Sequence, residues 1–354
     1  MKLLENLYEI RHKNNHFFNR KISIKSKRTL IRGVKKAGKT SLIIDYLSKF
    51  NQENILYIDL NDTRVNSLEV AKNLKDFISS KLIKILVIEN FDNSFELPCV
   101  NEIIISSDIS FEGYDELTLY PLDFEEFISF DSKFSNIEHI FNNYTNKGSY
   151  PQTLLNNSNS IYWSTQEMIK LMIKDQKEFE IFKTLCIHQS SKVSLYRVYN
   201  YLKNYIKISK DKLYKVVKKL EDEKMIFLVP KYNSPNSLKK LYLIDFAMRD
   251  SLTFKKDFIK KFENMVFLEL IKRGKRVYYT DYVELYIEED KKAIFCIPFL
   301  PQEMIRLKLQ KIINYLKEIN IQKVDVITVG NQGEFWLKNI KCSITPFWEW
   351  ALAD

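Results

Sequence analysis

The chain has 354 residues, of which 45% are apolar, and 55 Lys and Arg against 45 Asp and Glu give it a formal net charge of +10. This length suits two or three domains at roughly 100–200 residues each, and the composition excludes a disordered or low-complexity chain. With no long apolar run and no closely spaced cysteines, we expect no signal peptide, membrane span, zinc site or disulfide framework, but a cytoplasmic protein that does not bind membranes.

The first informative stretch is residues 33–40, GVKKAGKT, which matches the phosphate-binding pattern GxxxxGK[ST] in full and holds two of only 7 glycines in the chain. A buried strand is expected before it over residues 29–32, and a helix after it over residues 41–47. In such a loop, backbone N–H groups and the helix N-terminus bind phosphate. We expect Lys39 to contact the β- and γ-phosphates and Thr40 to bind Mg²⁺. The predicted nucleotide-binding residues are Gly33, Val34, Lys35, Lys36, Ala37, Gly38, Lys39, Thr40 and Ser41.

Alternating strands and helices follow the loop, as a P-loop domain requires. The pattern predicts a helix over residues 67–80 and strands over residues 54–60, 83–88 and 102–105. Glu89 follows the second of these strands, where a carboxylate can organise Mg²⁺; the alternative is a solvated strand cap. Ser106 and Ser107 follow the third strand, where a hydroxyl can sense a γ-phosphate or hold a water; the alternative is a turn cap.

Six segments in chain order carry a resemblance to a known family: GVKKAGKTSL, YIDLND, ILVIENFD, IIISSD, LYPLDFEEFI and FNNYTNKGSYPQTLL. Together they resemble the archaeal and bacterial P-loop ATPases of the AAA+ and STAND type that carry a DUF4143-like C-terminal region. The resemblance implies ATP as the nucleotide, with Lys39 and Thr40 as the Walker A residues and Ser106 or Ser107 at the sensor position. The residues alone do not exclude GTP, and no arginine finger can be assigned from them.

The pair Glu89-Asn90 departs from this family, whose Walker B strand usually ends in Asp-Glu. Glu89 can still organise Mg²⁺, but Asn90 stands where a glutamate would polarise the attacking water, and an amide cannot accept that proton. We therefore take Glu89, Asn90 and Ser106 as the catalytic positions and expect MgATP binding with slow hydrolysis. The alternative is a nucleotide site that is mainly structural.

Residues 159–250 are expected to form a helical linker and a winged helix-turn-helix domain. The pattern predicts helices over residues 161–187, 194–202 and 211–220, then strands over residues 225–230 and 241–244. From residue 192 to residue 224, ten basic residues stand against four acidic ones, a net charge of +6. A basic helix beside a wing can neutralise DNA phosphates, so DNA is a candidate partner. The alternatives are a protein partner, self-association or a merely solvated face.

Residues 251–354 are expected to form a small α/β domain. The pattern predicts helices over residues 261–270 and 302–318 and strands over residues 276–280, 283–287, 293–298 and, as the last one, 323–329. This order is similar to the PD-(D/E)xK nuclease-like fold at the C-terminus of the family. Glu284 can supply its first acid, but Cys296-Ile297-Pro298 lacks the second acid and the lysine, so nuclease activity is not expected. The aromatic residues within 346–350 are expected to pack against this domain.

The expected α/β architecture is a P-loop, AAA+-like ATP-binding domain over residues 1–158, the winged-helix region over 159–250 and a degenerate nuclease-like domain over 251–354. The leading hypothesis is a weak ATPase that works as a molecular switch, in which MgATP binding alters how the winged-helix and C-terminal regions are presented to a partner. The alternative is a non-hydrolysing DNA-binding or protein-interaction module with a structural nucleotide site.

Overall fold

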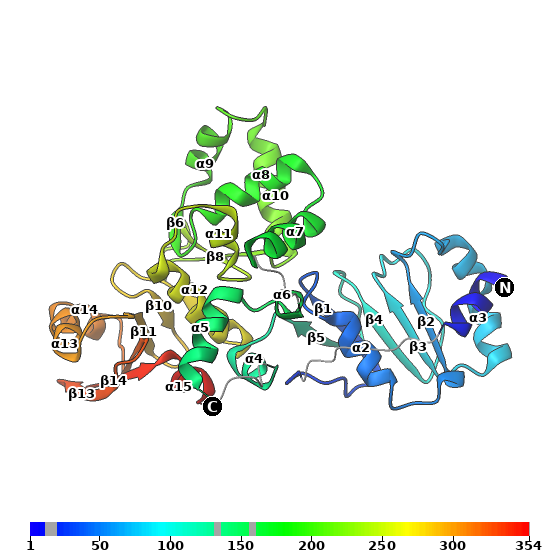
Figure 1. Cartoon of the computed structure of the whole chain (residues 1–354), viewed down its shortest axis with the longest axis horizontal. Helices are drawn as coiled ribbons and strands as arrows, with labels where there is room; N and C mark the ends of the chain where they lie inside the picture. Colours follow the sequence, from blue (N-terminus) through cyan, green and yellow to red (C-terminus); the bar gives the residue numbers. More distant parts are fainter. Residues whose placement is uncertain (11–19, 131–135, 156–160, 354) are drawn as a thin grey trace. The chain divides into compact units, whose positions relative to one another are not determined.

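The computed structural model describes residues 1–10, 20–130, 136–155 and 161–353 (Figure 1). The chain forms two compact units, Met1–Pro121 and Leu122–Asp354. The expected domain boundary between residues 158 and 159 lies outside the described residues, and the second compact unit begins well before it. No helix in the described part of the chain is long and apolar enough to cross a membrane.

The first unit is built around one parallel sheet, and this confirms the predicted α/β alternation. The strands are β1 (Arg28–Gly33), β2 (Ile55–Asp59), β3 (Ile85–Glu89), β4 (Glu102–Ser106) and β5 (Asp115–Leu119), in the order β2-β3-β4-β1-β5. The helices are α1 (Lys2–Glu9), α2 (Lys39–Leu47) and α3 (Ser67–Lys81), with a short 3₁₀ turn at Gln52–Asn54. Both α1 and β5 fall outside the prediction. The edge strand β5 begins with two exposed acidic residues and lacks the apolar run of a buried strand.

Side-chain alternation along the strands divides this sheet into two faces. One face carries Ile88 and Ile105, which pack in a core cluster with residues of α1 and α3. Because successive side chains point to opposite faces, Glu89 and Ser106 lie on the other face, and so does Asp59, which follows a strand residue of the same cluster. Asp59 is level with Glu89, and Ile88 is level with Ile105. Asp59, Glu89 and Ser106 therefore form a row across β2, β3 and β4, which we call the carboxyl-edge row.

The second unit begins with a series of helices. These are α4 (Phe124–Phe130), α5 (Ile137–Lys147), α6 (Pro151–Leu155), α7 (Ile161–Met172) and α8 (Gln176–Cys186). The prediction of one continuous helix over residues 161–187 is wrong, because the chain breaks between α7 and α8. The Asp175 carboxylate accepts a hydrogen bond from the Glu178 backbone N–H at 2.9 Å and so caps the start of α8.

A small antiparallel sheet follows in the order β6-β8-β7. Its strands are β6 (Ser191–Val193), β7 (Ile226–Val229) and β8 (Lys239–Leu243), and the helices between β6 and β7 are α9 (Leu195–Leu202) and α10 (Lys210–Asp222). The two helices and the strands β7 and β8 confirm the elements predicted between residues 194 and 244. The short strand β6 falls outside the prediction.

The last part of the second unit holds a six-stranded mixed sheet in the order β13-β14-β12-β11-β10-β9. The strands are β9 (Val277–Tyr278), β10 (Leu285–Ile287), β11 (Lys292–Cys296), β12 (Lys323–Thr328), β13 (Gly333–Leu337) and β14 (Ile340–Pro346). The helices are α11 (Met248–Leu252), α12 (Phe258–Lys272), α13 (Gln302–Lys311), α14 (Ile313–Glu318) and α15 (Phe347–Leu352). The prediction that residues 323–329 form the last strand is wrong, because β14 follows and pairs in parallel with β12.

One core cluster explains why the second unit begins at Leu122. Phe124 of α4 and Tyr144 of α5 are fully buried in it. The Phe124 ring lies 5.5 Å from that of Phe347, and the Tyr144 ring lies 4.8 Å from that of Phe246. The LDFEEFI part of LYPLDFEEFI, from Leu122 on, and the FNNYTNKGSYP segment thus belong to the second unit, whereas Leu119 ends β5 in the first. The Phe347 ring lies 6.0 Å from that of Phe262 of the C-terminal region, as predicted, but it also packs against Phe124 and Phe141 of α4 and α5.

Candidate nucleotide-binding site

The phosphate loop takes its shape from two glycines with positive φ. Strand β1 ends at Gly33 (φ +129°), where a Cβ would lie 2.0 Å from the backbone oxygen of Leu119 in β5. Gly38 (φ +99°) is the left-handed N-cap of α2, and no side chain caps this helix. The first turn of α2 therefore presents N–H groups and the positive end of the helix dipole to a phosphate. Gly33 serves the packing of the sheet, and Gly38 serves the turn into the helix.

Side chains from within the first unit hold the loop in place. Val34 and Ala37 are buried, whereas Lys35 and Lys36 are exposed. The guanidinium of Arg20 donates a hydrogen bond to the Ala37 carbonyl oxygen at 2.8 Å and a second to a carbonyl just after β5. The loop is thus fixed between the sheet and Arg20, a residue that the sequence pattern gave no reason to select.

Lys39 is the first residue of α2, and its ammonium lies over the start of its own loop. Its Nζ donates to the carbonyl oxygens of Gly33 at 2.6 Å and Val34 at 3.3 Å. Burial lowers the pKa of Lys39, and the charges of Asp108 and Glu89 oppose this shift. A phosphate would compensate the burial of this ammonium better than carbonyl oxygens do, because charge-assisted hydrogen bonds are the stronger ones.

The side chains of Thr40 and Glu89 meet between α2 and β3. The Thr40 hydroxyl lies 2.8 Å and 3.1 Å from the two carboxylate oxygens of Glu89. Glu89 is only 3% exposed, and its burial raises its pKa against the hydrogen bonds that Tyr57 and Thr40 donate to it. Both groups are hard oxygen donors, and Mg²⁺ at phosphate sites needs only one or two of these beside phosphates and waters. The pair fits Mg²⁺ in this way, although the described residues contain no cluster of three or more metal-binding side chains.

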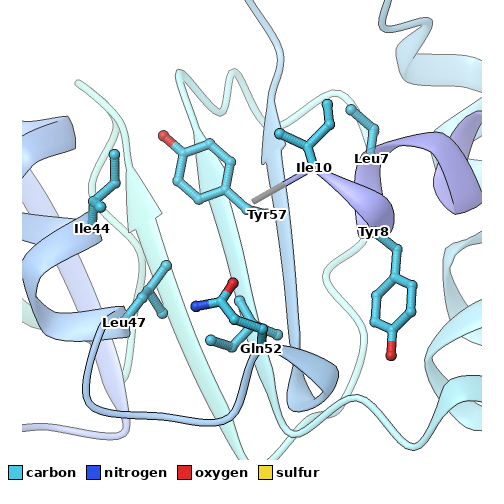
Figure 2. Close-up of a pocket in the computed structure, with 8 residues that line it drawn as sticks. Leu7, Tyr8, Ile10, Ile44, Leu47, Gln52 and Tyr57 are labelled. Carbon is cyan, nitrogen blue, oxygen red and sulfur yellow. The ribbon is translucent and has the colours of Figure 1, made fainter. Parts of the chain in front are cut away.

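Tyr57 connects Glu89 to the surrounding helices. Its hydroxyl donates to Glu89 Oε2 at 2.5 Å, and burial beside this carboxylate raises the pKa of Tyr57, so the phenol stays protonated. Its ring lines a small pocket together with Ile44 of α2 and Leu7 and Ile10 near the end of α1 (Figure 2). Thr40 and Tyr57 therefore fix the Glu89 carboxylate from two sides. Tyr57 was missed in the sequence because its position in a strand reads as ordinary core.

Asn90 turns its amide toward β2. The residue has φ +57°, and its Nδ2 donates to Asp59 Oδ1 at 2.7 Å. The same oxygen accepts the Asn61 backbone N–H at 2.9 Å. The amide at the expected catalytic position thus holds a carboxylate from the neighbouring strand. Asp59 was also missed in the sequence, although it ends a buried strand just as Glu89 does.

The two serines after β4 have different surroundings. Ser107 Oγ donates to the Phe91 carbonyl oxygen at 2.6 Å and accepts the Ile109 N–H at 3.1 Å, so Ser107 caps the turn. Ser106 is the last residue of β4, is buried, and stands level with Glu89 in the carboxyl-edge row. Of the two hydroxyls, the strand register brings that of Ser106 to the predicted site.

In the second unit, some basic residues on and between α9 and α10 form salt bridges and others do not. Lys212 and Lys219 lie 3.5 Å and 2.7 Å from the Glu178 carboxylate. Within the described residues, no salt bridge involves a second set of cations, all of them exposed: Arg197, Lys203, Lys207, Lys210, Lys215 and Lys218. Two of them, Lys203 and Lys210, lie over tyrosine rings of α9, and all six are exposed to solvent.

The acids of the C-terminal region lie apart from the phosphate loop in the sequence and have their own partners. Glu263 accepts hydrogen bonds from Lys240 Nζ at 2.6 Å and from the Tyr242 hydroxyl at 2.5 Å. Glu284, the predicted first nuclease acid, has Lys308 Nζ 3.6 Å from Oε1, while its enclosed Oε2 has no hydrogen-bond partner among the described residues. Burial raises the pKa of both glutamates. Lysines therefore stand beside both acids.

No protein-family model matches the chain. It is 25% identical to the uncharacterized protein MJ1544 of Methanocaldococcus jannaschii, over 94% of this chain and 91% of that protein. Among solved structures, it is similar to a Walker-type ATPase of Pyrococcus abyssi (15% identity, TM-score 0.44, 64% of this chain and 91% of that one). It is also similar to the ORC1 protein of Aeropyrum pernix in complex with DNA (10% identity, TM-score 0.35, 66% of this chain and 87% of that one). The expected family stays a prediction.

Proposed function

We propose that the protein is a MgATP-binding molecular switch with slow ATP hydrolysis, in which the nucleotide alters how the second unit is presented to a partner. The observation that carries this proposal is the contact of Thr40 with Glu89 at 2.8 Å beside a complete phosphate loop. It puts a hydroxyl and a carboxylate suited to Mg²⁺ next to the Lys39 ammonium. ATP rather than GTP follows from the family resemblance.

Each residue of the site has a definite role in this proposal. The backbone of residues 33–41 and the Lys39 ammonium bind the β- and γ-phosphates, and Thr40 and Glu89 hold Mg²⁺. Ser106, level with Glu89 in the carboxyl-edge row, senses the γ-phosphate. Hydrolysis is slow because Asn90 replaces the glutamate that would polarise the attacking water.

The test compares MgATP binding and turnover in the wild type, Lys39→Ala and Lys49→Ala. Lys49 is exposed just beyond the end of α2 and serves as the matched control. Loss of a charged hydrogen bond costs about 1.5–3 kcal/mol, so Lys39→Ala should weaken MgATP binding by about 10- to 150-fold. Lys49→Ala should bind as the wild type does. Equal affinity in all three proteins would refute the proposal, and binding without any turnover would favour the structural nucleotide site.

A second proposal concerns DNA. We propose that the helices α8, α9 and α10 and the strands β7 and β8 form a winged helix. Its cations that have no salt bridge then bind DNA phosphates. We also propose that the six-stranded sheet belongs to a degenerate nuclease-like domain. The observation that favours DNA binding is the set of six exposed cations without a salt bridge on and between α9 and α10. They stand in contrast to Lys212 and Lys219, which Glu178 neutralises.

Salt dependence tests the DNA proposal directly. Each phosphate contact contributes about 0.9 to the slope of log affinity against log salt concentration, so Lys210→Ala/Lys215→Ala/Lys218→Ala should reduce the slope by about 2–3. The matched control is a triple alanine variant of three exposed lysines elsewhere in the second unit: Lys311, Lys317 and Lys323. An equal slope in both variants would contradict DNA binding by α10 and favour a protein partner.

A further inference from the structure

The proposed function gives the metal ion a carboxylate, Glu89, but it gives the attacking water none. Both carboxylate oxygens of Glu89 accept hydrogen bonds, from Thr40 and from Tyr57. The Asn90 amide donates to Asp59 and is committed to that contact. Slow hydrolysis still requires a group that accepts a hydrogen bond from the water and orients it toward the γ-phosphorus.

Asp59 is the other carboxylate of the carboxyl-edge row. Its Cα is the register partner of the Glu89 Cα in a parallel pair, and such strands lie about 4.8 Å apart. Both side chains emerge on the face of the sheet opposite the α1 and α3 cluster. The two carboxylates are close enough for the charge of Asp59 to contribute to the raised pKa of Glu89. Asp59 therefore lies next to the proposed Mg²⁺ ligand, one strand further from the loop.

The Asp59 carboxylate is fixed at one oxygen and uncommitted at the other. Oδ1 accepts the Asn90 Nδ2 donor at 2.7 Å and the Asn61 N–H at 2.9 Å. In the described part of the chain, no hydrogen bond reaches Oδ2. The side chain is half-buried, so solvent has access to it. One acceptor oxygen is thus available in an orientation that the Asn90 amide helps to set.

Two other acids lie near the same edge of the sheet. Asp92 is exposed, and its Oδ1 accepts the Ser94 N–H at 3.1 Å, so it caps a turn. Asp108 follows β4, and its charge acts on Lys39. No hydrogen bond among the described residues orients the Asp108 carboxylate, which makes Asp108 the rival that a test has to separate from Asp59.

We propose that Asp59 positions the attacking water through Oδ2 and that Asn90 is a positioning residue that holds Oδ1. This assignment rests on the proposed function, because it needs ATP at the phosphate loop. As the water oxygen bonds to the γ-phosphorus, the bond from that phosphorus to the bridging oxygen breaks and ADP leaves. One water proton stays on the inorganic phosphate and the other is released to solvent. Asp59 accepts a hydrogen bond from the water while the new bond forms.

The experiment compares Asp59→Asn, Asn90→Ala and Asp108→Asn with the wild-type full-length protein. Three quantities are measured: kcat for ATP, the affinity for MgATP, and the affinity for MgADP with aluminium fluoride, which imitates the transferring phosphoryl group and its water. Thermal unfolding checks that each variant is folded. Asp59→Asn keeps the shape of the side chain and removes only the charge and one acceptor.

We expect Asp59→Asn to lower kcat by about 10- to 100-fold, the range that loss of one charge-assisted hydrogen bond in the transition state gives. Its MgATP affinity should stay near that of the wild type, while the affinity for MgADP with aluminium fluoride falls. Asn90→Ala should lower kcat less, and Asp108→Asn should leave it near the wild-type value. A wild-type kcat in Asp59→Asn, or a loss seen only in Asp108→Asn, would overturn the assignment. Absence of Lys39-dependent MgATP binding would instead refute the proposed function itself, and the assignment with it.

Discussion

Replacement of Gly33 by alanine tests whether the first glycine of the phosphate loop is required by the sheet. A side chain at φ +129° carries a backbone strain of about 1–3 kcal/mol. In addition, the new Cβ would lie 2.0 Å from the Leu119 carbonyl oxygen, and Gly33 and Leu119 are paired in the sheet. Neither residue can move without opening the β1–β5 pair, and overpacking adds about 1–3 kcal/mol. We expect Gly33→Ala to lower the free energy of unfolding of the first unit by about 2–6 kcal/mol.

Gly113→Ala is the matched control for this prediction. Gly113 has φ +78°, but no atom of the described residues lies within 4 Å of its would-be Cβ, so only the strain of about 1–3 kcal/mol applies. Urea unfolding is followed by far-UV circular dichroism and by tryptophan fluorescence, which reports the second unit because Trp163, Trp336, Trp348 and Trp350 all lie there. If Gly33→Ala unfolds at the same urea concentration as Gly113→Ala, the close approach of β5 does not determine the glycine.

Three further predictions concern the metal site and the second unit. Thr40→Val should weaken MgATP binding by about tenfold or more, as measured by calorimetry, but leave the binding of Mg²⁺-free ATP unchanged. An equal loss of affinity without Mg²⁺ would contradict the role of Thr40 as a metal ligand. Glu269 accepts hydrogen bonds from the Phe124 N–H and the Tyr144 hydroxyl. Glu269→Leu should therefore lower the free energy of unfolding by about 1–3 kcal/mol for each buried donor that loses its acceptor. Urea unfolding measures this loss against Glu269→Gln, which keeps an acceptor. Burial raises the pKa of Glu263 and Glu269 above the ordinary 4.5, so the folded state holds protons that the unfolded state has released. The stability of the second unit should therefore fall as the pH rises above about 4.5, and a Tm near pH 8 equal to that near pH 5 would contradict this.

The phosphate loop could be predicted from sequence because its chemistry is local. Eight consecutive residues determine the turn, the ammonium and the hydroxyl, and Glu89 is identified by the buried strand that precedes it. The contacts that Tyr57 makes with Glu89 and Asp59 makes with Asn90 could not be predicted in the same way. They depend on β2 lying beside β3 and on the register of these two strands, and the pattern of a single strand contains neither. Sequence reasoning therefore predicted the residues that a local motif or a strand end marks, and it missed Tyr57 and Asp59, which meet them from the neighbouring strand.

The extent of the second unit depends on contacts between residues that lie far apart in the sequence. Phe124 packs against Phe347 and Tyr144 packs against Phe246, and both partners come far later in the chain. Hydrophobic periodicity shows that a side chain is buried but not against which core. Strand β14 is a simpler miss, because its buried and half-buried residues alternate along the strand, a pattern that is visible in the sequence.

The core shared by α4, α5, α12 and α15 determines where the polypeptide can be divided into separately expressed fragments. A fragment that ends at residue 158 would carry Phe124, Phe127, Phe141 and Tyr144 into water, although all four are buried in the intact chain. Each such side chain buries about 150–250 Å² of surface, and the core of the complementary fragment would contain cavities where these rings pack. A cut after Pro121 spares both cores and keeps the phosphate loop, Glu89 and Asp59 in one piece. A fragment of residues 1–121 should accordingly stay folded, whereas a fragment that ends at residue 158 should expose an apolar surface.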